Sequence, residues 1–347
     1  MKRFLIAAVM GAIGLTGCGG GGGSDGGVST PSASLPTVTI TAANQASVTR
    51  ATIDGGQAFG QSQPFAATGG TAAQAIGSAP MALRTGVLQS VVHRGLLAAF
   101  GSRHDTSIAS ATRPTATSSS TDPCSVSGSI TTTVSDADNS QSVSSGDTLT
   151  LTFNQCRESS ADVVSGGMIF TIGSVSSALA SNVQFSGSLA FVQLSASSGT
   201  RLSNIQGSVG VAAAISSTSF QIALTVGADA LTVTSSAPGY LDTIVYEPGM
   251  QLVVTATQGV VAQSDVTLNG SFTASSIGGR ILVATVLPLR QLGTEINPSS
   301  GQVIVTGAAG THLRVTALSA TSVQLELDAN GDGTYERSGV FAWDTIG

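Results

Sequence analysis

Oxygen-bearing side chains occupy every second position of one short segment near residue 330. Asp328, Asn330 and Asp332 follow one another at intervals of two residues, and Thr334 continues the spacing. Calcium is a hard cation that takes about six to eight oxygen ligands from carboxylates, side-chain amides and backbone carbonyls. The three acidic or amide side chains and the carbonyl of Thr334 would supply several of these ligands. We therefore expect no obligatory cofactor, and calcium is the ion that this segment would hold.

The segment Asp328–Gly333 resembles the opening of an EF-hand calcium loop, D-x-[DN]-x-[DN]-G. It departs from that family at Gly339, where the bidentate glutamate should stand, so that Glu336 or Asp344 would have to substitute. Strands rather than helices are also expected on both sides. The alternative is a metal-free tight hairpin, because Asn-Gly and Asp-Gly are strong signals for two-residue turns.

Two cysteines, Cys124 and Cys156, lie within the part of the chain that is expected to fold. An even pair in an exported protein predicts a disulfide bond, because thiols are oxidised outside the cytoplasm. The alternative is two separate buried thiols. A zinc site is disfavoured, since the three histidines have no ligand spacing relative to these cysteines.

The first eighteen residues resemble a bacterial lipoprotein signal peptide. Lys2 and Arg3 precede an apolar stretch, Phe4 to Ile13, that is shorter than the roughly 20 residues needed to span a bilayer. Leu15-Thr16-Gly17-Cys18 then resembles the lipobox of that family, in which the cysteine is lipidated and the peptide is cut before it. The resemblance implies a lipid on Cys18 and removal of residues 1–17. The alternative is an ordinary cleaved signal with a chance cysteine.

The expected location is the outer membrane, with the protein facing either the periplasm or the outside. Gly19 follows the lipidated cysteine, whereas an aspartate there resembles a retention signal for the inner membrane. Two or three acyl chains hold a protein on a membrane stably. The membrane, contacted through the lipid, is therefore the one partner that the sequence indicates.

Charge and composition argue against nucleic-acid binding. Charged residues make up only 9% of the chain, and removal of residues 1–17 leaves 11 arginines against 19 acidic residues. Nucleic-acid ligands need clustered basic side chains, and none is present. No enzyme is expected either, because the sequence has no nucleophile elbow outside its glycine run and we can align no acidic pair on neighbouring strands.

The chain divides into three parts after the signal peptide. Residues 18–36 form a Gly/Ser-rich tether, which has no apolar surface to bury. Residues 37–123 hold a helix at about 80–100, a weaker helix from Asn44 towards Phe59 that Gly55-Gly56 disfavours, and a Ser/Thr-rich linker. We expect the first of these helices to pack in a core, with membrane contact as the alternative.

Residues 124–347 form the third part, where apolar side chains alternate with polar ones. The alternation predicts roughly a dozen antiparallel strands. A Gly-Ser-apolar unit recurs within this part and favours a strongly bent sheet, at Gly128, Gly187, Gly207 and Gly270. The expected fold is mainly β: a large curved antiparallel sheet, half-barrel or sandwich-like, with one or two N-terminal helices packed on it.

That architecture is similar to the half-barrels of periplasmic lipoprotein-carrier proteins, although no sequence motif supports the analogy. We expect a non-enzymatic lipid-anchored envelope protein with a structural or binding role. The alternative is a carrier or sensor that holds an acyl chain or other apolar ligand in the concave sheet. Neither a protein partner nor a ligand can be identified from the residues.

Overall fold

The computed structural model describes residues 35–61, 117–140, 144–157, 162–176, 182–216, 219–257, 263–292, 295 and 297–346. Cys18, residues 19–34 of the tether and the helix expected at about 80–100 lie outside these residues. Within them, no helix combines the length and the apolar character that crossing a membrane requires.

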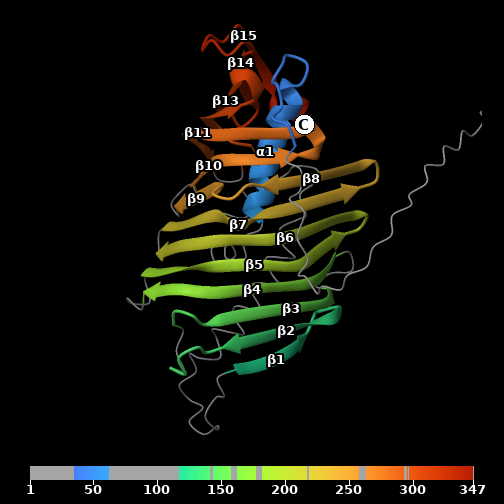
Figure 1. The fold of residues 1–347 in the computed structure, drawn as a ribbon, viewed down its shortest axis with the longest axis vertical. Coiled ribbons are helices and arrows are strands. Elements are labelled where there is room, and N and C mark those ends of the chain that lie inside the picture. The colour runs from blue at the N-terminus through green and yellow to red at the C-terminus, as the bar shows by residue number, and fades with distance from the viewer. Residues whose placement is uncertain are drawn as a thin grey trace, which may run out of the picture. The chain divides into compact units, whose positions relative to one another are not determined.

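Fifteen strands form a single antiparallel sheet, in which almost every strand pairs with its neighbours in the chain (Figure 1). Among the described residues, two helices and two 3-10 turns accompany it. The elements are α1 (Gln45–Gln61), β1 (Thr117–Pro123), β2 (Ser127–Ser135), β3 (Thr148–Arg157), β4 (Asp162–Ser176), β5 (Asn182–Ser198), β6 (Arg201–Ser216), β7 (Ser219–Ala237), β8 (Tyr240–Tyr246), β9 (Gln251–Thr257), β10 (Gln263–Ala274), η2 (Ser275–Ile277), β11 (Gly279–Leu292), β12 (Ser300–Thr306), η3 (Ala308–Gly310), β13 (His312–Ser319), β14 (Ser322–Asp328), β15 (Arg337–Ala342) and α3 (Trp343–Ile346).

The predicted mainly β fold, with an N-terminal helix on a large antiparallel sheet, is confirmed. The sheet begins earlier than expected, because β1 takes residues 117–123 from the predicted linker.

One irregularity interrupts the simple order of the strands in the sheet. The long strand β7 pairs with β9 along its first half and with β8 along its second half, and both of these pair with β10. Strands β8 and β9 therefore share one strand position.

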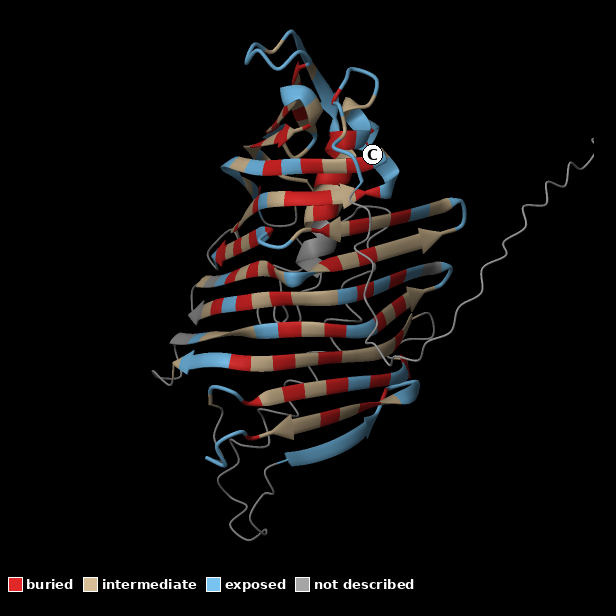
Figure 2. Ribbon diagram, in the orientation of Figure 1, coloured by how far each residue is buried: buried red, intermediate tan, exposed pale blue. Residues whose placement is uncertain are grey.

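Burial alternates along the strands as the sequence pattern requires (Figure 2). In β14, for example, Val323, Leu325 and Leu327 are buried while the residues between them are partly exposed. We call the side of the sheet that carries these side chains the buried face. Its members in β3–β7 include Leu151, Phe170, Leu189, Val209 and Leu224, all at most 5% exposed. An apolar residue at every second position of a strand therefore indicates that one side of the sheet is buried.

The recurring glycines permit bulges and close approaches of neighbouring strands. Gly207 has a φ of +115°, and the register of β6 against β7 shifts between Gly207 and Val209. A β-carbon at Gly207 would collide with the carbonyl oxygen of Ala230. At Gly187 a β-carbon would meet the carbonyl oxygen of Thr171 on the adjacent strand. Such bulges bend a strand and increase its twist, which is the role expected of these glycines.

Helix α1 forms despite the Gly55-Gly56 pair, because the first of these glycines lies against the sheet. The Tyr246 hydroxyl donates a hydrogen bond to the Gly55 carbonyl oxygen at 2.6 Å. A β-carbon on Gly55 would come within 2.9 Å of Cζ of Phe272, whose ring is fully buried beside Tyr246. The weak helix propensity at this position is therefore compensated by a close helix–sheet contact.

Alanine substitutions at the two glycines should have opposite effects on stability. Both gain about 1 kcal/mol of helix propensity. Gly56→Ala meets only Leu268 at 3.4 Å and should stabilise the domain, whereas Gly55→Ala forces its methyl group against Phe272. Overpacking costs about 1–3 kcal/mol of stability. The free energies of unfolding of the two variants, measured with urea, should therefore differ by that amount. Equal unfolding midpoints would show that α1 does not approach the sheet this closely.

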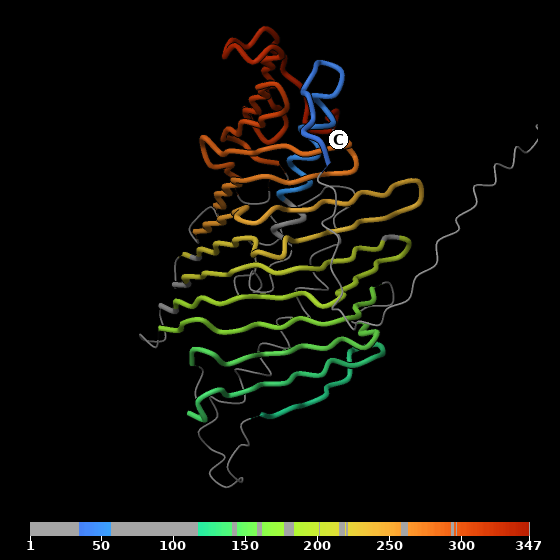
Figure 3. The backbone as a smooth tube through the Cα atoms, in the orientation of Figure 1, coloured from blue at the N-terminus to red at the C-terminus, as the bar shows by residue number. Residues whose placement is uncertain are grey.

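The first described residues lie beside the start of β11 (Figure 3). The Arg280 amide donates to the Pro36 carbonyl oxygen at 2.9 Å, and the Val38 amide donates to the Arg280 carbonyl oxygen at 3.0 Å. Thr37 and Arg280 form an isolated parallel bridge. The chain that follows the tether is thereby fixed to a central strand of the sheet.

Candidate functional site

The segment with calcium-ligand spacing connects β14 to β15. Asp328 ends β14 and is fully buried, and its two carboxylate oxygens accept hydrogen bonds from the amides of Gly331 at 2.7 Å and Gly333 at 2.9 Å. The loop closes on the pair Leu327 and Arg337, so residues 329–336 make the connection. The connection is therefore longer than the two-residue turn of a tight hairpin.

The other predicted ligands line the same loop. The Asn330 side-chain oxygen accepts from the Asp332 amide at 2.9 Å, and a carboxylate oxygen of Asp332 accepts from the Thr334 amide at 2.7 Å. The hydrogen bonds from Thr334 lower the pKa of Asp332, so its carboxylate is charged at neutral pH. Gly333 has a φ of +86°, at the position where an EF-hand loop needs glycine for its sharp turn.

Glu336, one of the two expected substitutes for the missing glutamate, belongs to the same group of acids. One carboxylate oxygen from each of Asp328, Asp332 and Glu336 lies within 4.8 Å of the others. The Ala329 amide holds Glu336 in place with a 3.0 Å hydrogen bond to Oε2. Asp344, the other expected substitute, lies in α3 and is not part of this group. The loop thus gathers three carboxylates although Gly339 supplies none.

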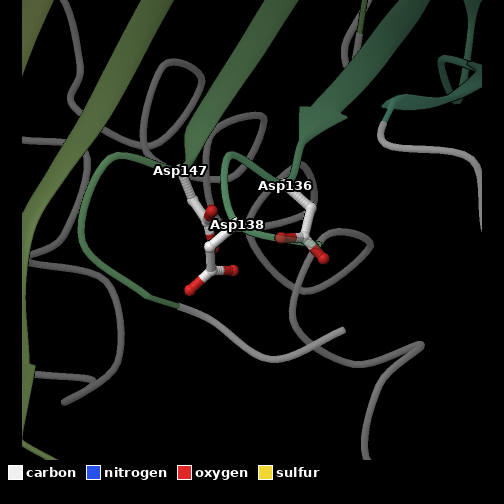
Figure 4. A group of neighbouring side chains, drawn as sticks. All are labelled: Asp136, Asp138 and Asp147. Carbon is white, nitrogen blue, oxygen red and sulfur yellow. The ribbon is translucent and has the colours of Figure 1, made fainter. Parts of the chain in front are cut away.

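A second acidic cluster, which the sequence reasoning missed, lies between β2 and β3 (Figure 4). Asp136 follows β2 and Asp147 precedes β3, so the turn between these strands brings them together with Asp138. One oxygen from each carboxylate lies within 4.8 Å of the others. Sequence reasoning aligned no acidic pair on neighbouring strands, and these three acids lie in the connection between two strands rather than on them.

Hydrogen bonds order the acids of the second cluster. Asp147 is 2% exposed and accepts from the Ala137 amide at 2.9 Å and the Ser144 amide at 2.8 Å. Hydrogen bonds from the hydroxyl and amide of Ser140 lower the pKa of Asp138 to about 2. The spacing could have identified this cluster, because Asp136, Asp138 and Asp147 match the first, third and twelfth positions of an EF-hand loop.

Two further acids, Asp54 in α1 and Asp242 in β8, lie close enough to interact electrostatically. Asp242 is buried and accepts hydrogen bonds from the hydroxyls of Ser275 at 2.7 Å and Ser276 at 3.0 Å. Burial raises the pKa of Asp54, and the charge of Asp242 adds to that rise, while Arg50 pairs with Asp54 at 2.6 Å and opposes it. The Asp242 carboxylate thus orders the turn η2, while Asp54 is paired with Arg50 within α1.

Cys124 and Cys156 form the predicted disulfide bond, with a Cα–Cα distance of 5.5 Å. Cys124 lies between β1 and β2, and Cys156 lies in β3. The bond therefore joins the strands at one edge of the sheet.

No catalytic triad is assembled within the described part of the chain. His312, the histidine it contains, shares a 3.1 Å hydrogen bond with the Thr306 hydroxyl, and His93 and His104 lie outside the described residues. No family model, curated protein or solved structure matches the chain.

Proposed function

We propose that this is a non-enzymatic lipoprotein of the bacterial outer membrane, anchored by a lipid on Cys18 and serving a structural or binding role in the envelope. The observation that carries the proposal is the cysteine pairing. The chain has three cysteines, and Cys124 is bonded to Cys156, which leaves the thiol of Cys18 for lipidation. Disulfide bonds persist in oxidising compartments such as the periplasm, so the bond also supports export.

The buried face supports a structural role over the carrier alternative. A carrier without its ligand would offer a cavity lined by exposed apolar side chains. Leu151, Leu189 and Leu224, on three strands of the sheet, are at most 2% exposed, so their apolar surface is already removed from solvent. Polar residues on the opposite side form cross-strand ladders, such as the 3.0 Å hydrogen bond between Thr121 and Thr131.

Replacing Cys18 with serine should release the protein from membranes. The serine hydroxyl cannot form the thioether to the lipid, and a protein without acyl chains has no stable anchor. Cells that express wild type or Cys18→Ser would be labelled with palmitate and fractionated. A labelled variant that still sediments with the outer membrane would contradict the anchor.

We also propose calcium as the ligand of the Asp328 loop, because Glu336 brings a third carboxylate to Asp328 and Asp332. Each carboxylate oxygen that accepts one amide hydrogen bond retains a lone pair for a cation. Calcium should therefore stabilise the folded domain, by about 2.7 kcal/mol when its free concentration is a hundred times the dissociation constant.

Thermal unfolding with calcium or with a chelator measures this effect. Wild type should melt at a higher temperature with calcium, and Asp332→Ala should lose most of that difference. Asp138→Ala is the matched control, because it neutralises an exposed acid of the other cluster, and it should keep the response. Equal melting of wild type in both conditions, or an unchanged response in Asp332→Ala, would exclude the Asp328 loop as the site.

A further inference from the structure

An apolar bulge protrudes from β11, the strand on which the chain after the tether is fixed. Ala284 pairs with Asn269 and Leu289 pairs with Val266, so residues 285–288 of β11 stand opposite only residues 267–268 of β10. The register against β12 shifts in the same place. Extra residues on one strand of an antiparallel pair make a β-bulge, which bends the strand locally, and Thr285 and Leu287 remain paired with β12.

Side chains of the neighbouring residues stabilise this bulge. The Thr285 hydroxyl accepts from the Leu268 amide at 2.7 Å and donates to the Leu268 carbonyl oxygen at 2.9 Å. The Asn269 side-chain oxygen accepts from the Thr285 amide at 2.9 Å. These bonds satisfy backbone groups that the bulge removes from the ladder, and Pro288 has no amide to satisfy. The residues therefore specify the protrusion.

The bulge presents large apolar side chains to solvent. Val286 is 50% exposed and Leu287 is 57% exposed, and Leu282 on the same strand is 41% exposed. Contiguous exposed apolar side chains mark a surface for a protein or a membrane, and Val286 and Leu287 are adjacent in the bulge. We name Leu282, Val286 and Leu287 the β11 apolar surface.

The acidic residues beside this surface are neutralised. Glu247 receives two hydrogen bonds from Arg280, at 2.6 and 2.8 Å, and Asp265 receives two from Arg290, at 2.7 and 3.0 Å. The chain as a whole is acidic and would be repelled by an anionic membrane. Near β11 both of these acids are paired with arginines, so the repulsion between the protein and the membrane is removed locally. This favours contact with lipid.

The tether ends where this surface begins. Residues 19–34 separate Cys18 from the first described residue, and Pro36 and Val38 are hydrogen-bonded to Arg280. A chain of that length reaches at most about 53–58 Å. Six residues of strand from Arg280 to Val286 span about 20 Å. A lipid on Cys18 would thus keep the bilayer within reach of the β11 apolar surface.

We propose that Leu282, Val286 and Leu287 form a docking surface for the lipid bilayer, on which the domain rests when Cys18 is anchored. This inference rests on the proposed lipidation. The bilayer takes the place of solvent around three exposed aliphatic side chains, and the anchor supplies the high local concentration that so small a surface needs.

Site-specific quenching tests the docking surface. Full-length lipidated protein, with an environment-sensitive fluorophore on Val286→Cys, is reconstituted into phosphatidylcholine vesicles whose acyl chains carry bromine. Val192→Cys is the matched control, because Val192 is also a valine at a register shift and is 49% exposed, on the distant strand β5. Quenching at position 286 should exceed that at position 192 by about twofold or more, because only the former would lie near the acyl chains.

Flotation of the same samples separates this inference from the proposed function. If the protein floats with the vesicles and the two positions are quenched equally, the anchor stands and the docking surface is wrong. Stronger quenching at position 192 than at position 286 would likewise show that the docking surface is wrong. If the wild-type lipidated preparation does not float, the proposed lipid anchor and the proposed docking surface are both wrong. Since both positions are exposed, thermal melts should match wild type and confirm folding.

Discussion

The Phe272→Ala variant should lose about 3–5 kcal/mol of unfolding free energy. Phe272 is fully buried, its ring lies 5.8 Å from that of Tyr246, and it supports the α1 backbone at Gly55. Truncation removes apolar surface from the core and leaves a cavity between helix and sheet. Urea unfolding, followed by circular dichroism, measures the loss.

Phe341→Ala is the control for that measurement. Phe341 lies on β15 at the end of the sheet and is 36% exposed, so its truncation should cost about 1 kcal/mol or less. Similar losses for the two phenylalanines would contradict the packing of α1 on the sheet.

Removal of the Cys124–Cys156 disulfide should cost about 3–4 kcal/mol in the chain-entropy model. The bond closes a loop with a sequence separation of 32 and ties the start of β2 to β3. The double variant Cys124→Ser/Cys156→Ser would be compared with wild type in urea. Both cysteines are buried, so the serines add a smaller cost of their own.

Reductant separates the bond from the substitutions. It should lower the unfolding midpoint of wild type and leave that of the double variant unchanged. A wild-type midpoint that is insensitive to reductant would mean that the bond contributes no stability.

Alternating apolar residues made most of the strands predictable. The strand that was not predicted, β1, lacks this alternation. In β14 the pattern of Val323, Leu325 and Leu327 predicts a strand with one buried side, as found. Strand β1, by contrast, contains only serine, threonine, aspartate and proline, and every residue is exposed. It is held by its pairing with β2 rather than by burial, so periodicity could not reveal it.

The acidic sites illustrate a second limit of sequence reasoning. The Asp328 loop could be recognised because its ligands are adjacent in the chain, although the participation of Glu336 depended on how the loop folds. Asp136 and Asp147 stand at the two ends of the connection between β2 and β3, so their spacing was the one signal of the cluster and no run of alternating ligands marked it. Likewise, Gly55 disfavours a helix by propensity alone, and only the position of Phe272 explains its presence there.

The most direct test of the account is the mass of the N-terminal fragment of protein purified from membranes. Arg50 is the first arginine after Cys18, and Lys2 is the chain's lysine, so trypsin acting on denatured protein should release residues 18–50. We expect this fragment to begin at Cys18 and to carry the mass of a diacylglyceryl group, with a further acyl chain on its amino group. A fragment with an unmodified Cys18, or one that begins elsewhere, would contradict it.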